Sequence, residues 1–438
     1  MNHTNNQVIL DVEEKPKALK WLALSFQHLF AMFGATVLVP FLVKLDPSVA
    51  LISSGIGTIT FLLITRGKVP AYLGSSFAFI APLIAAKAAA GPGAAMVGSF
   101  LAGVVYAIVA LLIKFSGYKW ILRVLPPIVV GPVIMVIGLS LAGTAVNMAM
   151  NDAKGHYSLL SFSAALLTLA VTIICSIYFK GFFNLIPVLI GIAAGYIYSL
   201  SVGLVDFAKV TSAPLLKLPD FIIPFADYTP ALTPDIIFLI VPIAVVTISE
   251  HIGHQLVLSK VVGRNYIKDP GLHSSLFGDG VATMIAACLG GPPSTTYGEN
   301  IGVLAITRVY SVFVIAGAAI FAILFGFVGT ISAFISSIPQ PVMGGVSILL
   351  FGIIASSGLR MMIDSKIDIG DKRNLIISSV ILVIGIGGAA LKFSDKFELQ
   401  GMALAAIIGV ILNLVLPGRS KEEIIVLEED SAKKHTVA

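Results

Sequence analysis

The sequence predicts an all-α polytopic membrane protein, and three observations carry that prediction. Of its 438 residues, 57% are hydrophobic and only 12% are charged, with a mean hydropathy of +0.98. Soluble domains average about 45–50% apolar and about 25% charged residues, so a soluble globule is excluded, and the low polarity excludes a disordered chain. In addition, apolar runs recur along the whole sequence, and basic residues gather between alternate runs.

Fourteen apolar segments, separated by charged or Gly/Pro-rich breaks, are predicted to cross the membrane. They are 21–43, 47–65, 70–89, 94–113, 120–146, 158–179, 181–205, 235–259, 270–290, 293–307, 309–335, 338–359, 373–391 and 399–417. The third and tenth segments fit a regular helical span poorly, because each is short or is interrupted by Gly, Pro, Ser and Thr. We expect these two to be short broken segments.

The distribution of Lys and Arg sets the expected orientation, since short cytoplasmic loops are enriched in basic residues. With the N-terminus inside and fourteen alternating spans, 21 of the 28 Lys and Arg residues lie inside and the other 7 outside. This bias predicts a multi-pass protein of the cell membrane with cytoplasmic tails at 1–20 and 418–438. It also explains the net charge of +5 without nucleic acid as a partner. Residues 1–20 lack a signal-peptide pattern, so we expect the first apolar run to stay in the membrane.

A proline-rich connection over 206–234 divides the spans into two groups of seven. Because seven is odd, the second group begins on the opposite side of the membrane, and any repeat between the halves must be inverted. The third segment reads YLGSSF over 72–77, and the tenth reads TTYGEN over 295–300 at the corresponding position. Paired irregular segments of this kind indicate a midplane binding site in secondary transporters. Chance similarity of two Tyr/Gly/Ser stretches remains the alternative.

Three acidic residues, Glu250, Asp279 and Glu299, fall inside apolar segments. An ionisable side chain at bilayer depth costs about 2.5–3.5 kcal/mol on insertion scales, so each needs a partner or a function. Glu250 and His254 are four residues apart and share one helix face. In low dielectric such a pair can bind and release a proton near neutral pH. His251 points elsewhere on the helix and is expected to pack or pair there, and a structural ion pair remains the alternative for Glu250 and Glu299.

The residues that open the tenth segment cannot begin as a regular helix. Pro292 and Pro293 lack N–H groups, and the glycines beside them permit a turning backbone. Non-helical backbone at membrane depth is tolerated only against protein or a water-filled cavity. We expect it to leave N–H and C=O groups unpaired, with a helix N-terminus aimed at the same point in each broken segment. Amide donors beside carboxylates suit a small planar ligand with alternating C=O and N–H groups, whereas the carboxylates would repel an anion.

These residues resemble the nucleobase–ascorbate transporter family, also called the second class of nucleobase:cation symporters. Its signature is Gln, Glu or Pro, then Asn-x-Gly, four residues, Thr, and a basic residue or Gly, and residues 299–308 read ENIGVLAITR. The positions that match are Glu299, Asn300, Gly302, Thr307 and Arg308. The resemblance extends over nearly the whole chain, from SFQHLFAMFG at 25–34 to PVMGGV at 341–346.

The resemblance implies a seven-plus-seven inverted repeat folded as two subdomains. Segments 1–4 and 8–11, residues 21–115 and 235–335, would form a core. Segments 5–7 and 12–14, residues 116–205 and 338–417, would form a gate. It also implies a homodimer in the lipid bilayer, with the proton as coupling ion and no other cofactor or metal.

The resemblance also implies how the site binds uracil. Glu250 and Glu299 would accept hydrogen bonds from the ring N–H groups. The backbone amides of Phe77 and Gly298 would donate to the two ring carbonyls, with Ser76 beside them. The ring of Phe77 would stack on the base.

Proton coupling is expected to involve Glu250, His254, Asp279 and His28. By the resemblance, His254 acts through water or proton transfer, and His28 lies near the core and supports the site. Asp279 looks like an acidic residue of the purine transporters, and it is either a second protonatable group or a helix-packing partner. Phe351 stands where some relatives carry Tyr, so a hydroxyl contact to the substrate is absent.

Together these features predict a proton-coupled symporter that imports uracil by alternating access, with a xanthine or urate symporter as the alternative. Glu299 favours uracil, because the xanthine-transporting relatives carry Gln at the matching position. A channel is disfavoured since no filter sequence occurs, and an anion exchanger since two carboxylates crowd the site. No Ser/His/Asp ordering, HExxH or GxGD motif indicates an enzyme. Cys175 and Cys288 lie in apolar stretches and are expected to act as small hydrophobic residues rather than as a disulfide or metal site.

Overall fold

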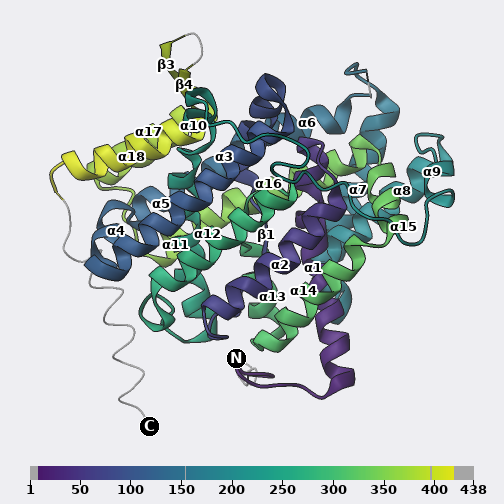
Figure 1. Cartoon of the computed structure of the whole chain (residues 1–438), viewed down its shortest axis with the longest axis horizontal. Coiled ribbons are helices and arrows are strands. Elements are labelled where there is room, and N and C mark those ends of the chain that lie inside the picture. Colours follow the sequence, from purple (N-terminus) through teal and green to yellow (C-terminus); the bar gives the residue numbers. More distant parts are fainter. Residues whose placement is uncertain (1–7, 153, 395–396, 419–438) are drawn as a thin grey trace.

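The computed structural model describes residues 8–152, 154–394 and 397–418, and it is built from helices packed side by side (Figure 1). Most of the predicted C-terminal tail and the first seven residues of the N-terminal tail lie outside the described residues. The α-helices are α1 (Ala18–Val43), α2 (Pro47–Ile64), α3 (Ile80–Ser116), α4 (Lys119–Val124), α5 (Pro127–Ser140), α6 (Ala142–Met150), α7 (Leu159–Tyr178), α8 (Pro187–Ser201), α9 (Ala208–Thr211), α10 (Pro234–Ile240), α11 (Ile243–Val262), α12 (Leu272–Leu289), α13 (Gly298–Thr307), α14 (Val312–Gly326), α15 (Gly329–Ser337), α16 (Gln340–Asp364), α17 (Lys372–Ile386) and α18 (Gly401–Val415). The shorter elements are the turns η1 (Phe77–Phe79), η2 (Gly181–Leu185) and η3 (Ile267–Gly271), and the strands β1 (Leu73–Ser75), β2 (Ser294–Thr296), β3 (Ala390–Ser394) and β4 (Phe397–Gln400).

The helices have the length and composition of membrane spans. In the described part of the chain, eight helical stretches are long and apolar enough to cross a bilayer, and α8, α14 and α18 are apolar but shorter. Each of the fourteen predicted segments includes helical residues. The helix α3 covers two of the predicted segments, with a kink at Ala90 and Gly91, just before Pro92. Proline cannot donate the helical hydrogen bond, which explains the break at that point.

Two small sheets depart from the all-helical prediction. β1 pairs antiparallel with β2, with Gly74 opposite Thr295, and β3 pairs with β4. β1 and β2 open the third and tenth segments, so two extended stretches from opposite halves of the chain lie edge to edge. The expectation that their backbone groups stay unpaired is therefore wrong, because each stretch satisfies the other.

The sheet formed by β1 and β2 is here called the central sheet. Side-chain hydroxyl groups pair the backbone groups at its outer edges. On one side, Leu73 N–H donates to Thr58 Oγ1 at 2.9 Å, and Ser54 Oγ donates to the Leu73 carbonyl at 2.6 Å. On the other, Thr283 Oγ1 donates to the Ser294 carbonyl at 2.8 Å and accepts from Ser294 N–H at 3.3 Å. Thus one threonine on α2 and one on α12 play equivalent parts, which keeps these buried backbone groups paired.

The helices pack in two groups. In the first, α12 packs against α2 and α3, and α14 packs against α1 and α2. In the second, α16 packs against α5, α6 and α7, while α17 packs against α5 and α18. α1 and α11 contact both groups, α1 through α8 and α16 and α11 through α5 and α18. The central sheet belongs to the first group and lies close to the border between the two.

The connection over 206–234 is attached to the first group of helices. Ile222 N–H donates to the Leu289 carbonyl at the end of α12, at 3.2 Å. Lys217 N–H donates to the Phe327 carbonyl beyond α14, at 3.1 Å. These contacts fix the connection across the ends of both helices.

Part of the predicted N-terminal tail is packed rather than free. Residues 9–14, here called the N-terminal strap, run along the segment that follows α13. Tyr310 N–H donates to the Leu10 carbonyl at 2.8 Å, and Val312 N–H donates to the Val12 carbonyl at 3.0 Å. The side chains of Leu10 and Val12 are buried. The strap therefore extends the fold at the end of α13.

Candidate functional site

Two carboxylates, each with a buried oxygen atom, face one region of the fold. Glu250 lies in the middle of α11 and is 6% exposed, and its Oε2 has no hydrogen-bond partner among the described residues. Glu299 lies in the first turn of α13, and its buried Oε1 likewise has no partner in the described part of the chain. α11, which carries Glu250, contacts η1, β2 and α13. Buried polar atoms are nearly always paired in folded proteins, so this pair marks a place for a ligand or proton.

His254 lies directly against the start of α13. A Cβ atom built on Gly298 would lie 3.0 Å from His254 Nε2, so a side chain at 298 would crowd the imidazole. His254 Nδ1 lies 3.5 Å from Thr296 Oγ1 at the end of β2. The structure therefore brings α11, with Glu250 and His254, against the start of α13, with Gly298 and Glu299. A role of these four residues in binding substrate stays a prediction.

The other broken segment contributes Ser76 and Phe77 to the same region. Ser76 N–H donates to the Pro293 carbonyl at 2.8 Å, and its buried Oγ has no partner among the described residues. Phe77 packs edge to face on Phe351 of α16, with ring centroids 5.8 Å apart and planes at 82°. Phe77 and Gly298 begin helical turns, so their N–H groups have no acceptor within those turns.

Tyr297 locks the two broken segments together. Its hydroxyl donates to the Ser75 carbonyl at 3.3 Å, and the side chain is 2% exposed. A Cβ atom on Gly74 would overlap the Tyr297 ring, so only glycine fits opposite the tyrosine. This contact sets how close the two segments lie to each other.

His28 and Asn300 connect α1 with α13. His28 Nε2 lies 2.6 Å from Asn300 Oδ1, and Asn300 Nδ2 donates to the Pro70 carbonyl at 3.2 Å. Both side chains are buried. Asn300 of the signature therefore ties the helix that carries Glu299 to α1 and to the residues before β1.

The remaining signature residues shape the end of α13. Thr307 Oγ1 donates to the Val303 carbonyl at 2.8 Å and accepts from Val309 N–H at 3.3 Å. Arg308 ends the helix in a left-handed conformation with φ of 53°. A Cβ atom on Gly302 would meet no atom within 4 Å. These three residues lie along α13 or at its end, and the contacts described for Thr307 are to backbone groups there.

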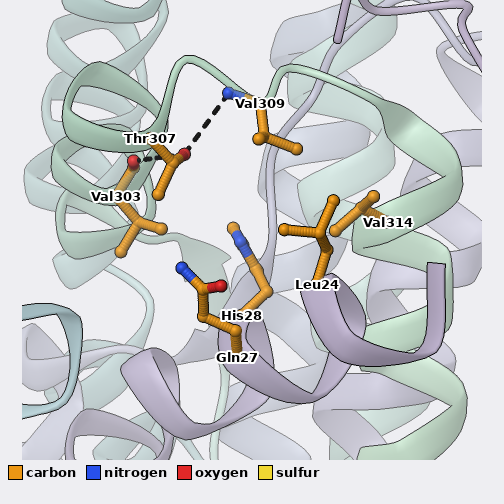
Figure 2. Close-up of a pocket in the computed structure, with 7 residues that line it drawn as sticks. All are labelled: Leu24, Gln27, His28, Val303, Thr307, Val309 and Val314. Atoms are coloured by element: carbon orange, nitrogen blue, oxygen red, sulfur yellow. Dashed lines mark hydrogen bonds between the residues drawn. The ribbon is translucent and has the colours of Figure 1, made fainter. Parts of the chain in front are cut away.

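A small pocket lies between α1 and α13 (Figure 2). Its lining residues are Leu24, Gln27, His28, Val303, Thr307, Val309 and Val314. Neither Glu250 nor Glu299 lines it, so it is distinct from the region of the carboxylates. His28 links the two, since it lines the pocket and contacts Asn300.

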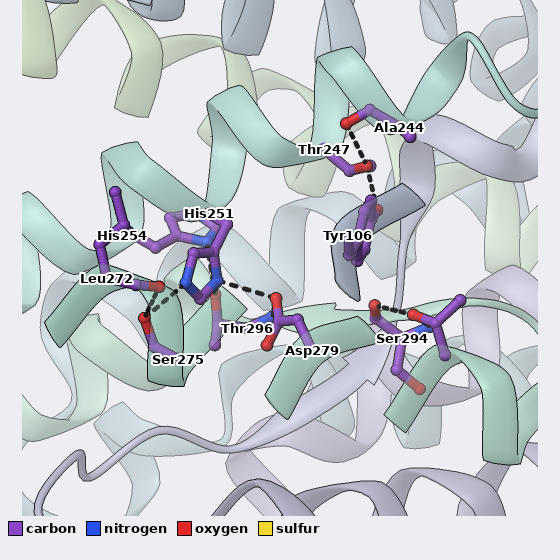
Figure 3. Close-up of polar contacts among 11 residues, drawn as sticks. Tyr106, Ala244, Thr247, His251, His254, Leu272, Ser275, Asp279, Ser294 and Thr296 are labelled. Atoms are coloured by element: carbon purple, nitrogen blue, oxygen red, sulfur yellow. Dashed lines mark hydrogen bonds and ion pairs between the residues drawn. The ribbon is translucent and has the colours of Figure 1, made fainter. Parts of the chain in front are cut away.

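Asp279 is paired with His251 rather than with Glu250. His251 Nδ1 lies 2.8 Å from Asp279 Oδ2, and both side chains are 1% exposed (Figure 3). The prediction that His251 pairs elsewhere is thus confirmed. Asp279 forms a contact between α12 and α11, which agrees with its interpretation as a helix-packing partner. Proton binding by Asp279 stays a prediction.

Comparisons with known proteins identify the family. A model described as the permease family matches residues 19–393. A uracil permease of Bacillus caldolyticus is 67% identical over 98% of this chain and 99% of its own length. Uracil permeases of Bacillus subtilis (strain 168) and Escherichia coli (strain K12) are 61% and 45% identical, over 99% and 96% of this chain and 100% and 98% of their own lengths. The chain belongs to the nucleobase–ascorbate transporter family.

Solved structures place this permease fold among other transporters. The transmembrane domain of the cyanobacterial bicarbonate transporter BicA has a TM-score of 0.61 and 12% identity, over 93% of this chain and 100% of that domain. SLC26A9 has a TM-score of 0.66 and 12% identity, over 94% of this chain and 65% of that protein. At such low identity the likeness concerns the fold alone. The permease is an integral membrane protein and a transporter, and its named relatives are permeases rather than enzymes.

Several residues that build the permease site escaped the sequence analysis. Thr58 and Thr283 close the edges of the central sheet, although isolated threonines in apolar helices usually bond to their own helix. Tyr297 stood in the repeated stretch TTYGEN but had no assigned contact. Ser275 and Thr296 gave no signal, because both contact His251, which lies on the separate helix α11.

Proposed function

We propose that this permease imports uracil by proton-coupled alternating access. The named relatives from three bacteria are uracil permeases, and two of them are more than 60% identical to this chain. The observation that carries the proposal is the pair of buried, unpartnered oxygens on Glu250 and Glu299. A ligand that offers two N–H donors satisfies both at once.

The chemistry of uracil matches the groups around this pair. Its ring N–H groups donate to Glu250 and Glu299, and its carbonyl oxygens accept from the backbone N–H groups of Phe77 and Gly298. The ring lies against the Phe77 side chain, where stacking favours a flat, polarisable molecule. Ser76 Oγ is a further unpartnered group beside Phe77.

The same pairing gives selectivity. A heterocycle that lacks one N–H group leaves a buried carboxylate oxygen without a donor, which costs about 1–3 kcal/mol or more for a charged group. Sites that hydrogen-bond a polar group discriminate strongly against analogues that lack it. Methylation of a uracil ring nitrogen is therefore expected to abolish transport.

Proton coupling follows from the same carboxylates. Glu250 and Glu299 each keep one oxygen away from water without a partner among the described residues, and a proton that joins them removes the cost of a buried charge. His254 lies beside Gly298 and is placed to exchange that proton, with His28 and Asp279 as further members of the path. Binding of the proton and binding of the neutral base then support each other.

The architecture that we propose is a seven-plus-seven inverted repeat. Segments 1–4 and 8–11 form the core, with its site at the two broken segments, and segments 5–7 and 12–14 form the gate. The separate packing of the two helix groups and the equivalent threonines on α2 and α12 support this division. We further propose a homodimer in the cell membrane with both termini in the cytoplasm.

Uptake of radiolabelled uracil in a permease-deficient strain tests the proposal. We expect unlabelled uracil to compete with the labelled substrate and excess xanthine to leave its uptake unchanged. A protonophore should abolish accumulation. Competition by xanthine as strong as by uracil would favour the purine alternative. Accumulation that ignores the protonophore would contradict proton symport. The exposed Asp235→Asn substitution serves as a control that removes one carboxylate outside the site.

A further inference from the structure

Tyr106 of α3 forms a buried hydrogen bond with α11 that involves none of the groups assigned to the substrate. Its hydroxyl contacts Thr247 Oγ1, and both side chains are 1% exposed (Figure 3). Thr247 Oγ1 also donates to the carbonyls of Ile243 and Ala244 in its own helix, at 3.2 and 3.3 Å. Because its hydrogen is used there, Thr247 accepts from the Tyr106 hydroxyl. Tyr106 is therefore the donor in this bond between the two helices.

The backbone beside Tyr106 is fixed against α12 by two glycines. A Cβ atom on Gly280 would lie 2.8 Å from the Gly103 carbonyl oxygen and 2.9 Å from Tyr106 Cβ. A Cβ atom on Gly103 would in turn lie 2.7 Å from the Gly280 carbonyl oxygen. Neither position leaves room for a side chain, so α3 and α12 pack backbone against backbone here. The Tyr106 side chain therefore extends from a closely packed pair of helices.

Specific contacts join each pair of the helices α3, α11 and α12. The two glycines join α3 to α12, and the contact of Asp279 with His251 joins α12 to α11 at 2.8 Å. The bond between Tyr106 and Thr247 joins α11 to α3. Within the part of the chain that the structure describes, no other side-chain hydrogen bond connects α3 with α11. Without this bond, only apolar packing would hold α11 against α3.

The bond lies close to Glu250 along α11. Residues three and four apart are neighbours on a helix surface, so Thr247 borders both Glu250 and His251. A helix with its side chains is about 10–12 Å across, so a rotation of about 10° moves the end of a side chain by about 1 Å. A shift of that size is enough to stretch a hydrogen bond out of its normal range. The rotation of α11 therefore decides whether Glu250 can reach a ring N–H group of a bound base.

We propose that Tyr106 is a positioning residue: through Thr247 its hydroxyl fixes the rotation of α11, and with it the place of the Glu250 carboxylate. The contact of His251 with Asp279 restrains the same rotation from the side of α12. Tyr106 itself needs no contact with the substrate for this role. The inference rests on the proposed uracil site and adds the residue that aligns one of its two carboxylates.

Tyr106→Phe tests the inference, because phenylalanine keeps the ring and removes only the hydroxyl. We expect the Kd for uracil, measured on the purified full-length protein, to rise about three- to tenfold, the range for one weakened hydrogen bond. In proteoliposomes the KM should rise by a similar factor, while the maximal rate of uracil exchange stays near that of the parent. Thr247→Val should have the same effect. Thr247→Ser keeps a hydroxyl and should bind uracil like the parent.

Two further variants make the test specific for this bond. The double variant Tyr106→Phe/Thr247→Val should bind uracil no more weakly than either single variant, because both substitutions remove the same bond. Tyr198→Phe is the matched control. The Tyr198 hydroxyl lies 2.9 Å from Ser163 Oγ, between α8 and α7, and these helices carry none of the proposed site residues. This variant should bind uracil like the parent.

Three results would overturn the role of Tyr106. One is a Kd for uracil equal to that of the parent in Tyr106→Phe or Thr247→Val, whatever happens to the midpoint of thermal unfolding. Another is an equally large rise of the Kd in Tyr198→Phe, and the third is a double variant whose rise is the product of the two single rises. If Tyr106→Phe does not fold, Thr247→Val and Thr247→Ser must show the same contrast. A parent protein that does not bind uracil would instead contradict the proposed function itself.

Discussion

Glu299 combines a buried oxygen that lacks a partner with a place in the first turn of α13. Replacing Glu299 with Gln puts an NH₂ group where one of the two acceptors stood. Where that group faces a ring N–H of uracil, one hydrogen bond is lost and two donors oppose each other. Loss of a hydrogen bond to a charged group costs about 1.5–3 kcal/mol, so we expect affinity to fall about 10–100-fold.

Calorimetric titration of purified protein with uracil measures this effect. Asp235→Asn, exposed at the start of α10, controls for the loss of one negative charge and should bind as the parent does. Unchanged affinity in Glu299→Gln would remove the carboxylate from the binding site.

The sequence singled out individual polar residues well where burying them in a membrane costs much free energy. Glu250, Asp279 and Glu299 could be singled out because acidic groups in apolar segments are expensive. Their partners could not be predicted in the same way. The contact between His251 and Asp279 depends on how α11 and α12 are aligned. That alignment cannot be derived from the sequences of the two helices.

The N-terminal strap joins the ends of the two helices that carry the carboxylates. Arg264, just beyond α11, pairs with Asp11 at 3.0 Å and with Glu13 at 2.9 Å. Tyr310, beyond α13, donates its hydroxyl to the Val261 carbonyl at 3.1 Å. The strap therefore helps to fix α11 relative to α13, and with them the spacing of the site.

Val12→Asp tests the contribution of the strap to stability. Val12 is 0% exposed, and a carboxylate there would be buried without a partner, which should destabilise the protein by at least about 2 kcal/mol. Val8→Asp is the matched control, because Val8 is 50% exposed just before the strap. The midpoint of thermal unfolding in detergent measures both. Equal midpoints for the two variants would show that the strap does not stabilise the fold.

Elements were predicted well where apolar runs delimit them, and less well where two elements meet. The irregular backbone at 70–77 and 292–297 was expected from its Pro and Gly residues. Its pairing as β1 and β2 was not, because neither stretch has the length or alternation of a strand. Likewise, residues 9–14 contain no apolar run that would indicate a packed segment.

At the scale of the whole molecule, the proposed orientation can be tested by labelling. Lys154 lies in the loop between α6 and α7, which is predicted to be outside, and Lys366 lies between α16 and α17, predicted to be inside. With Cys175 and Cys288 replaced by Ala, a membrane-impermeant thiol reagent should label Lys154→Cys in intact cells. Lys366→Cys should react only after permeabilisation. The reverse pattern would contradict the proposed orientation.

The overall class of the molecule was predictable because the bilayer restricts the possible folds. Composition and spacing of apolar runs indicate helical spans, and the permease fold agrees. How the spans gather into two packed groups could not be derived from periodicity, since helices that are apolar on most faces do not reveal which neighbour they contact. The division into core and gate came only from the resemblance to known transporters, and it stays a prediction.

The pairing of β1 with β2 has a consequence for how the protein is made. Translation starts at the N-terminus, so Leu73–Ser75 emerges long before Ser294–Thr296. Until the later strand arrives, the earlier one lacks a neighbour, and the lipid interior offers no water to substitute. The third segment can therefore reach its final pairing only when the second half has been inserted, so the proposed uracil site is completed late in synthesis.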